Sequence, residues 1–304
     1  MIPMFPNFKK LELGDKQDIE KRYCGTIVPS DYHFASLWAW DLNEDLEVSL
    51  LNDNLVVKFQ DYQTSERFYS FFGKNNLENT LNTLLNFIKI NGLGSKVSLI
   101  PEQNFEDSDF TRLSESFDIQ EDKDNFDYIF SVKDLLNYSG KKLYSKKKQL
   151  NKFLENYIKV TNVVTFETIN PDIEKDVLGL LIKWSKIKVT RNEIEISALK
   201  KTLGLIPQIK FLIFCVYIHD QLVGFSILEI MDKNHAIHSF QKADLSYVGI
   251  TEFINNRIAQ YLNKLGVAYI NAEQDLGVEG LRRAKHSYNP TFLKKYTISK
   301  KSAH

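Results

Sequence analysis

Two apolar segments joined by a polar turn dominate the second half of the chain. The segments are KFLIFCVYI (210–218) and FSILEI (225–230), and the turn between them is HDQLVG (219–224). Apolar runs of this length, rich in β-branched and aromatic residues, predict an antiparallel hairpin when they flank a turn. The segment HAIHSF (235–240) predicts a third strand beside them. A β-sheet is therefore expected at the centre of this half.

Amphipathic helices are predicted between the strands of both halves. In the first half, a hairpin around residues 51–54 and the strand 67–72 precede a helix from Leu77 to Gly92 and strands at 96–100 and 126–132. In the second half, the predicted elements besides the three strands above are a lysine-rich helix (141–158), a strand (163–169), a helix (172–188), a helix (249–265), a strand (267–273), a short helix (278–287) and a last strand (293–298).

This order of elements recurs loosely in both halves and predicts two related α/β domains. Each is expected to be a mixed, mostly antiparallel sheet flanked by helices. The predicted boundaries are 1–135 for the first domain, 136–160 for a basic linking helix, and 161–304 for the second domain.

Composition excludes several classes of protein. The chain is 43% hydrophobic, which suffices for a packed core and excludes a disordered protein. The longest fully apolar run, Phe211 to Ile218, is too short to span a bilayer, and the N-terminus lacks the pattern of a secretory signal. Two cysteines, Cys24 and Cys215, are too few for a disulfide framework. His235 and His238 are expected on opposite faces of one strand, so no metal site is predicted. These features predict a cytoplasmic globular protein.

Charge is balanced overall but unevenly distributed. Lys plus Arg and Asp plus Glu both number 39. Residues 102–127 hold ten acids and two bases, 133–159 eight lysines and two acids, and 282–301 seven bases and no acid. Each run alone is typical of a solvated surface. Two basic runs in a neutral chain favour an anionic ligand, such as the phosphates of a cofactor, an RNA or a lipid headgroup.

The order of elements in the second half resembles the GNAT acyltransferase fold. In that family the cofactor pyrophosphate lies at the N-terminus of the long helix, where backbone N–H groups and the helix dipole attract anions. At the corresponding place this sequence has SYVGIT (246–251), which keeps only Gly249 of the family's usual small residues. Gly249 is a candidate anion-binding residue, with a simple structural turn as the alternative.

The densest group of polar residues is NAEQDLGVEGLRRAKHSYNP (271–290). Glu273 and Asp275 share a face if the preceding strand continues. Arg282 and Lys285 share a face of the short helix. A carboxylate pair opposite two cations predicts a site for an anion and an amine, and a structural salt-bridge cluster is the alternative. Tyr288 is a candidate proton donor or a core aromatic residue.

The run E-x-D-L-G-x-x-G-L-R-x-A-K-x-S-Y-x-P (273–290) resembles the signature of the phosphatidylglycerol lysyltransferase C-terminal-domain family. The segment DYIFSVKDLLNYSGKKLYSKKKQLNKF (127–153) resembles its other hallmark. The resemblance covers about residues 10–298. It implies a tandem GNAT-like fold related to the Fem peptidyltransferases, and transfer of an aminoacyl group from a charged tRNA to a lipid headgroup. By this resemblance Asp275, Arg282 and Lys285 match the closing motif, and Lys146, Lys147 and Lys148 match a stretch that holds RNA or lipid phosphate.

Three functions follow as hypotheses. The first is an aminoacyltransferase with an aminoacyl-tRNA donor and a lipid or soluble amine or hydroxyl acceptor, acting in the cytoplasm or at the membrane surface. Asp275 is then the expected general base, Glu273 its substitute, and Arg282 a two-pronged ligand for phosphate or carboxylate. The second is an acyl-CoA-dependent N-acyltransferase. The third is a non-catalytic module that binds RNA or anionic lipid. None requires a metal or a resident cofactor, and no DNA partner is expected.

Overall fold

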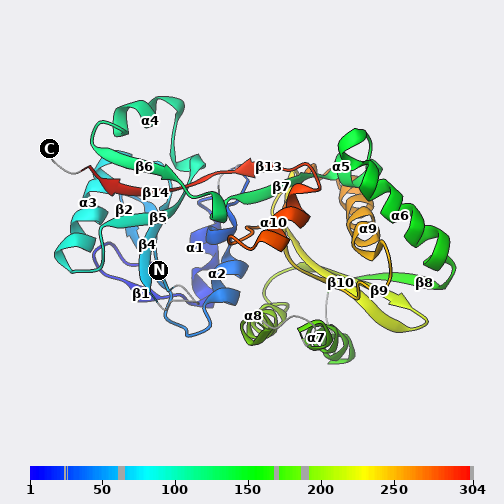
Figure 1. Cartoon of the computed structure of the whole chain (residues 1–304). Coiled ribbons are helices and arrows are strands. Elements are labelled where there is room, and N and C mark those ends of the chain that lie inside the picture. Colours follow the sequence, from blue (N-terminus) through cyan, green and yellow to red (C-terminus); the bar gives the residue numbers. More distant parts are fainter. Residues whose placement is uncertain (24, 26, 61–65, 168–170, 186–191, 302–304) are drawn as a thin grey trace. The chain divides into compact units, whose positions relative to one another are not determined.

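The computed structural model describes residues 1–304 except 24, 26, 61–65, 168–170, 186–191 and 302–304. The chain forms two compact units (Figure 1). Unit 1 consists of residues 1–126 and 293–304, and unit 2 consists of residues 127–292. Cys24 and residues 186–188 of one predicted helix lie outside the described residues.

A seven-stranded sheet forms the centre of unit 2, in the order β13-β7-β12-β11-β10-β9-β8. Its strands are β7 (Asp127–Ser131), β8 (Thr161–Phe166), β9 (Phe211–Ile218), β10 (Gln221–Ile230), β11 (His235–Ala243), β12 (Tyr269–Asn271) and β13 (Thr291–Leu293). All pairings for which a register is defined are antiparallel except that of β11 with β12. The parallel pair is joined through α9 (Ile250–Lys264), which is the usual way to connect parallel strands.

Helices cover both faces of this sheet (Figure 1). On one face lie α5 (Val132–Asn137), α6 (Tyr144–Tyr157) and α9, and on the other lie α7 (Pro171–Ser185) and α8 (Asn192–Gly204). The first face holds the main core of the unit, where the Phe153 and Phe253 rings of α6 and α9 stack with centroids 4.3 Å apart. The short α10 (Glu279–His286) follows β12.

Unit 1 contains two further sheets. One has the order β1-β2-β3-β4 and the other β5-β14-β6. The elements are β1 (Lys9–Lys10), α1 (Lys16–Glu20), α2 (Phe34–Trp40), β2 (Glu47–Leu51), β3 (Asn54–Gln60), β4 (Arg67–Phe72), α3 (Leu77–Ile90), β5 (Lys96–Pro101), α4 (Asp107–Leu113), β6 (Phe117–Glu121) and β14 (Lys295–Lys300). The apolar face of α3, which includes Leu81 and Leu84, packs in one core with residues of both sheets. A buried ion pair joins Lys295 and Asp31 within this unit.

Unit 1 is built from both ends of the chain, whereas unit 2 is one continuous segment. Strand β7 comes from the first half of the sequence but pairs with β12 of unit 2. Strand β14 comes from the end of the chain but pairs with β5 and β6 of unit 1. The predicted domains 1–135 and 161–304 assign β7 to the first unit and β14 to the second, the reverse of what the structure shows, because periodicity identifies a strand and not its partner.

Most predicted elements are present, and the mixed α/β class is confirmed. Two differences matter for the site. The strand predicted for 267–273 ends at Asn271, because Glu273 adopts a left-handed backbone conformation with φ of 57°. Glu273 and Asp275 therefore do not share a strand face. Helix α8 was not expected, since its apolar residues follow no clear amphipathic period.

Candidate functional site

Asp275 is at the centre of a polar cluster where the chain passes from β12 to α10. Its side chain is 0% exposed and accepts four hydrogen bonds. Oδ2 accepts from the Tyr128 hydroxyl (2.5 Å) and from Arg282 Nε (2.8 Å), and Oδ1 accepts from Arg282 Nη2 and the Gly277 N–H (both 2.8 Å). Arg282 thus makes a bidentate contact with Asp275 inside the chain, and not with the ligand phosphate or carboxylate for which it was predicted.

These contacts set the acidity of both partners of the Tyr128–Asp275 bond. Burial by itself would raise the pKa of Asp275, but hydrogen bonds from Arg282 and Tyr128 outweigh burial and leave the pKa below its ordinary value. Burial, and then the bond to Asp275, raise the pKa of Tyr128 to about 12. The predicted role of Asp275 as general base is disfavoured by this geometry, because its acceptor positions are filled and its basicity is low.

Lys285 holds the end of β12. Its ammonium group donates to the carbonyl oxygens of Ala272 (2.6 Å), Glu273 (3.2 Å) and Gln274 (2.5 Å). The Glu273 carbonyl also accepts the N–H of Tyr128. The cation predicted to add charge to a ligand site thus fixes the backbone turn that carries Glu273 and Asp275.

A histidine that sequence analysis set aside lies near Lys285. His238 Nε2 is 2.5 Å from the hydroxyl of Ser226 on the neighbouring strand β10. Burial and the positive charge of Lys285 lower the pKa of His238 to about 4, so the imidazole is neutral at pH 7. The parallel pairing of β11 with β12 ends at Ile237 and Asn271, so His238 follows the point where the two strands stop pairing. Carboxyl ends of parallel strands are common ligand sites in α/β sheets.

The N-terminus of α9 is packed against α6. Gly249 has φ of 86°, and a Cβ atom there would lie 2.1 Å from the carbonyl oxygen of Gln149. Phe153 of α6 also lies against it. Gly249 therefore allows two helices to meet closely. The backbone of α6 therefore lies against the residue that precedes the first turn of α9.

Lys146 and Tyr288 contribute to the same helix contact. Lys146 Nζ lies 3.0 Å from Glu252 in the first turn of α9, and the two side chains are only 15% and 10% exposed. The ammonium group also lies 4.0 Å from the centroid of the Tyr288 ring. Tyr288 is buried and donates a hydrogen bond to Glu252 (3.3 Å). Both residues thus have partners inside unit 2.

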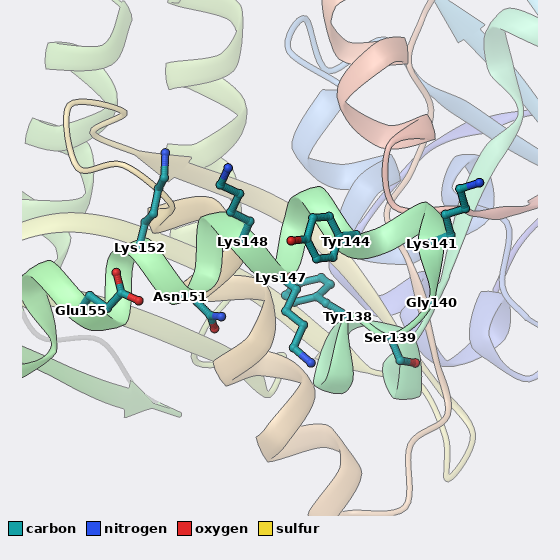
Figure 2. A pocket seen from close by; sticks show the side chains of 10 residues that line it. All are labelled: Tyr138, Ser139, Gly140, Lys141, Tyr144, Lys147, Lys148, Asn151, Lys152 and Glu155. Atoms are coloured by element: carbon teal, nitrogen blue, oxygen red, sulfur yellow. The ribbon is translucent and has the colours of Figure 1, made fainter.

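The exposed face of α6 is basic. Lys147, Lys148 and Lys152 border a surface groove of about 750 Å³, which Lys141 and Tyr144 extend at one end. Figure 2 shows Lys148 and Lys152 extending from one side of the helix and Lys147 from the other. Glu155 is the one acidic residue that lines the groove. Two of the three predicted phosphate-binding lysines are thus at the surface, and Lys141 and Lys152 are lysines of the groove that the prediction did not include.

Within the described ranges, no three His, Cys, Asp or Glu side chains are grouped so as to hold a metal ion. None of the described helices has the length and apolar character needed to cross a bilayer.

Solved structures share this fold over nearly the whole chain. A conserved protein of unknown function from Bacteroides thetaiotaomicron VPI-5482 is 27% identical with a TM-score of 0.83, over 99% of this chain and 100% of that chain. L-PGS from Bacillus licheniformis is 13% identical with a TM-score of 0.61, over 100% and 95%. A tandem GNAT protein from the clavulanic acid biosynthesis pathway is 10% identical with a TM-score of 0.50, over 98% and 99%. The fold is that of a tandem GNAT protein.

The family model described as "Phosphatidylglycerol lysyltransferase, C-terminal" matches residues 26–299. The chain belongs to this family, and the predicted resemblance is confirmed. A curated relative, an uncharacterised protein of Mycoplasmoides gallisepticum strain R(low), is 26% identical over 188 residues. That match spans 59% of this chain and 57% of the relative.

Proposed function

We propose that this protein is an aminoacyltransferase that takes its acyl group from a charged tRNA. The observation that carries the proposal is the exposed basic face of α6. Lys147, Lys148 and Lys152 of α6, and Lys141 just before it, form no salt bridge within the described part of the chain and line one groove. Several lysines without acidic partners around one groove suit the phosphates of a nucleic-acid backbone.

The packing of α9 favours this donor over acyl-CoA. An acyl-CoA donor would need the N-terminus of α9 for its pyrophosphate. Here the Gln149 carbonyl and Phe153 lie against Gly249, and Lys146 is engaged with Glu252. A carbonyl oxygen at this position repels a phosphate, so the contact acts against the second hypothesis both sterically and electrostatically.

The transfer itself joins an acceptor to the aminoacyl carbonyl. The oxygen or nitrogen of the acceptor attacks the ester carbon, the ester bond to the tRNA ribose breaks, and the proton of the acceptor passes to the departing ribose oxygen. We assign Asp275 a positioning role, because it holds Arg282 and Tyr128. The predicted role of base then falls to Glu273, which is partly exposed on the turn that Lys285 fixes. A lipid headgroup and a soluble amine or hydroxyl are both acceptors of suitable chemistry.

The proposal is tested first by titrating the protein with bulk tRNA at several salt concentrations. The variant K147A/K148A/K152A is expected to bind at least tenfold more weakly and to show a salt slope smaller by about two to three. A control, K89A/K133A/K200A, removes the same charge from scattered exposed lysines and is expected to bind like the wild type. Equal loss in both variants, or tighter binding of acetyl-CoA than of tRNA, would contradict the proposed donor.

Transfer is tested next with charged tRNA, using phosphatidylglycerol vesicles and soluble amines as acceptors. Glu273→Gln is expected to abolish transfer and to leave tRNA binding unchanged. If wild-type protein binds tRNA but transfers no aminoacyl group to any of these acceptors, the non-catalytic binding module is the better description.

A further inference from the structure

Strand β8 forms an open edge of the unit 2 sheet. Among the described strands it pairs with β9 alone. The Val160 carbonyl accepts the N–H of His219 on that side (3.3 Å). Backbone groups of alternate residues point to opposite sides in an antiparallel pair, so the N–H and C=O groups of Val163 and Thr165 point away from β9, as does the C=O of Thr161. The N–H of Thr161 donates to the carbonyl oxygen of Ile158.

This edge lacks the features that usually prevent strand pairing. Its sequence, TNVVTF, contains no charged residue and no proline. Its register with β9 runs without a bulge from Thr161 to Phe166. Edge strands of monomeric proteins are commonly guarded by lysine, proline or a bulge. The backbone of β8 is therefore suited to pair with another extended segment.

A groove of about 330 Å³ runs beside this edge, on the face that α9 covers. Thr161, Val163 and Thr165 line it from β8, which are the same residues whose backbone groups point outward. Its other walls contain no acidic residue and consist of Ile158, Phe214, Phe253, Arg257, Gln260, Tyr261 and Lys264. A strand added to β8 would place every second side chain on the groove side.

The cations of the groove lack an acidic partner. Arg257 stacks over the Phe253 ring with its guanidinium carbon 4.8 Å from the centroid, and Nη1 donates to Gln260 (2.8 Å). Burial lowers the pKa of Arg257, and no carboxylate among the described residues lies within ion-pair distance of it or of Lys264. Arg257 is partly buried whereas Lys264 is exposed, and partly buried charges are normally paired, so the Arg257 guanidinium favours a ligand with a carboxylate.

We propose that β8 and its groove bind an extended acidic peptide, which adds to the sheet as an eighth strand and places carboxylates near Arg257 and Lys264. In this mode, main-chain hydrogen bonds supply affinity and the groove selects side chains. A second copy of the chain fits less well. Its β8 carries no acid, and two-fold pairing of β8 with β8 would bring both Arg257–Lys264 pairs to the same face. This binding site is separate from the proposed aminoacyl transfer.

The test uses a capped, fluorescein-labelled heptapeptide in which valine alternates with glutamate, and a matched peptide with glutamine for glutamate. Fluorescence anisotropy is expected to show that the acidic peptide binds at least tenfold more tightly than the glutamine peptide. Arg257→Gln should weaken binding at least tenfold, whereas the exposed control Arg283→Gln should leave it unchanged. Equal binding of both peptides, no measurable binding, or no effect of R257Q would overturn the proposal.

Hydrogen exchange tests the strand pairing without a variant. Adding the acidic peptide to wild-type protein is expected to protect the amides of Val163 and Thr165, and unchanged exchange there would overturn the proposal. Val163→Pro removes one outward N–H and should weaken binding, while Val163→Thr keeps it. If light scattering shows a dimer that V163P dissociates, the edge belongs to a second copy and the peptide proposal fails.

Discussion

Asp275 illustrates how one buried carboxylate organises the turn between β12 and α10. It joins Tyr128 of β7, the Gly277 backbone and Arg282 of α10. Each of these groups would lose a charged acceptor if the carboxylate were removed. Because Arg282 remains about one third exposed, water compensates part of such a loss.

Asp275→Asn is therefore expected to lower the free energy of unfolding by about 2 kcal/mol, since hydrogen bonds to a charged acceptor are replaced by weaker ones in a side chain of the same shape. Urea unfolding followed by circular dichroism measures the change. Asp118→Asn, at an exposed position of β6, is the control and should stay within about 0.5 kcal/mol of wild type. Equal stability of the two variants would show that Asp275 has no structural role.

The lowered pKa of His238 predicts that the free energy of unfolding depends on pH. Its pKa is about 4 in the folded protein, against an ordinary value of 6.5. Between these values the unfolded chain binds the proton more readily, so protonation favours unfolding. The stability contributed by the neutral imidazole is fully present above pH 6.5 and is lost as the pH falls toward 4, by on the order of 3 kcal/mol.

Urea unfolding at pH 7, 5.5 and 4.5 tests this expectation. His238→Gln cannot take up a proton but can still bond to Ser226, so its stability should fall less over the same range. Parallel pH curves for the variant and the wild type would assign the acid sensitivity to other groups.

At the scale of elements, the contact between α6 and α9 depends on Gly249. Gly249→Ala is expected to cost about 3 kcal/mol, because the new methyl group meets the Gln149 carbonyl in addition to the strain of a positive φ. Gly266→Ala is a matched control. Gly266 also has a positive φ, of 80°, but a Cβ there meets no atom within 4 Å, so about 1 kcal/mol is expected. Thermal and urea unfolding measure the free energy of unfolding of both variants, and the difference between them is the cost of the steric clash at Gly249. Equal losses of stability in the two variants would exclude such a clash.

Much of this architecture could be predicted from sequence, because hydrophobic period and turns identify elements locally. The hairpin of β9 and β10, helix α3 and the short α10 lie where the pattern predicts them. Asp275, Arg282 and Lys285 were also identified as a group, whereas Tyr128 and His238 were not. The roles of the predicted residues were not identified, because a motif does not show that Lys285 bonds to three carbonyls or that Lys146 is engaged with Glu252. Those contacts depend on chain segments distant in sequence.

At the scale of the whole molecule, unit 1 is completed by a strand from the end of the chain, which no local pattern encodes. Strand β14 is the central strand of the β5-β14-β6 sheet, although it follows unit 2 in sequence. The same terminal segment also carries the buried Lys295, which forms an ion pair with Asp31 of unit 1. Unit 1 therefore cannot complete its core until the last residues of the chain have been added.

Removing residues 293–304 is expected to unfold unit 1 while unit 2 remains folded, because β5 and β6 pair through β14 and lose their shared partner. Hydrogen exchange measured by mass spectrometry should show rapid exchange across 1–126 and retained protection in 127–292. The fragment 127–292 is the matched control and should keep the protection pattern that unit 2 has in the full chain. Removing residues 301–304 instead leaves β14 whole and should leave unit 1 folded. Retained protection of β5 and β6 in the protein that lacks residues 293–304 would show that unit 1 is stable without β14.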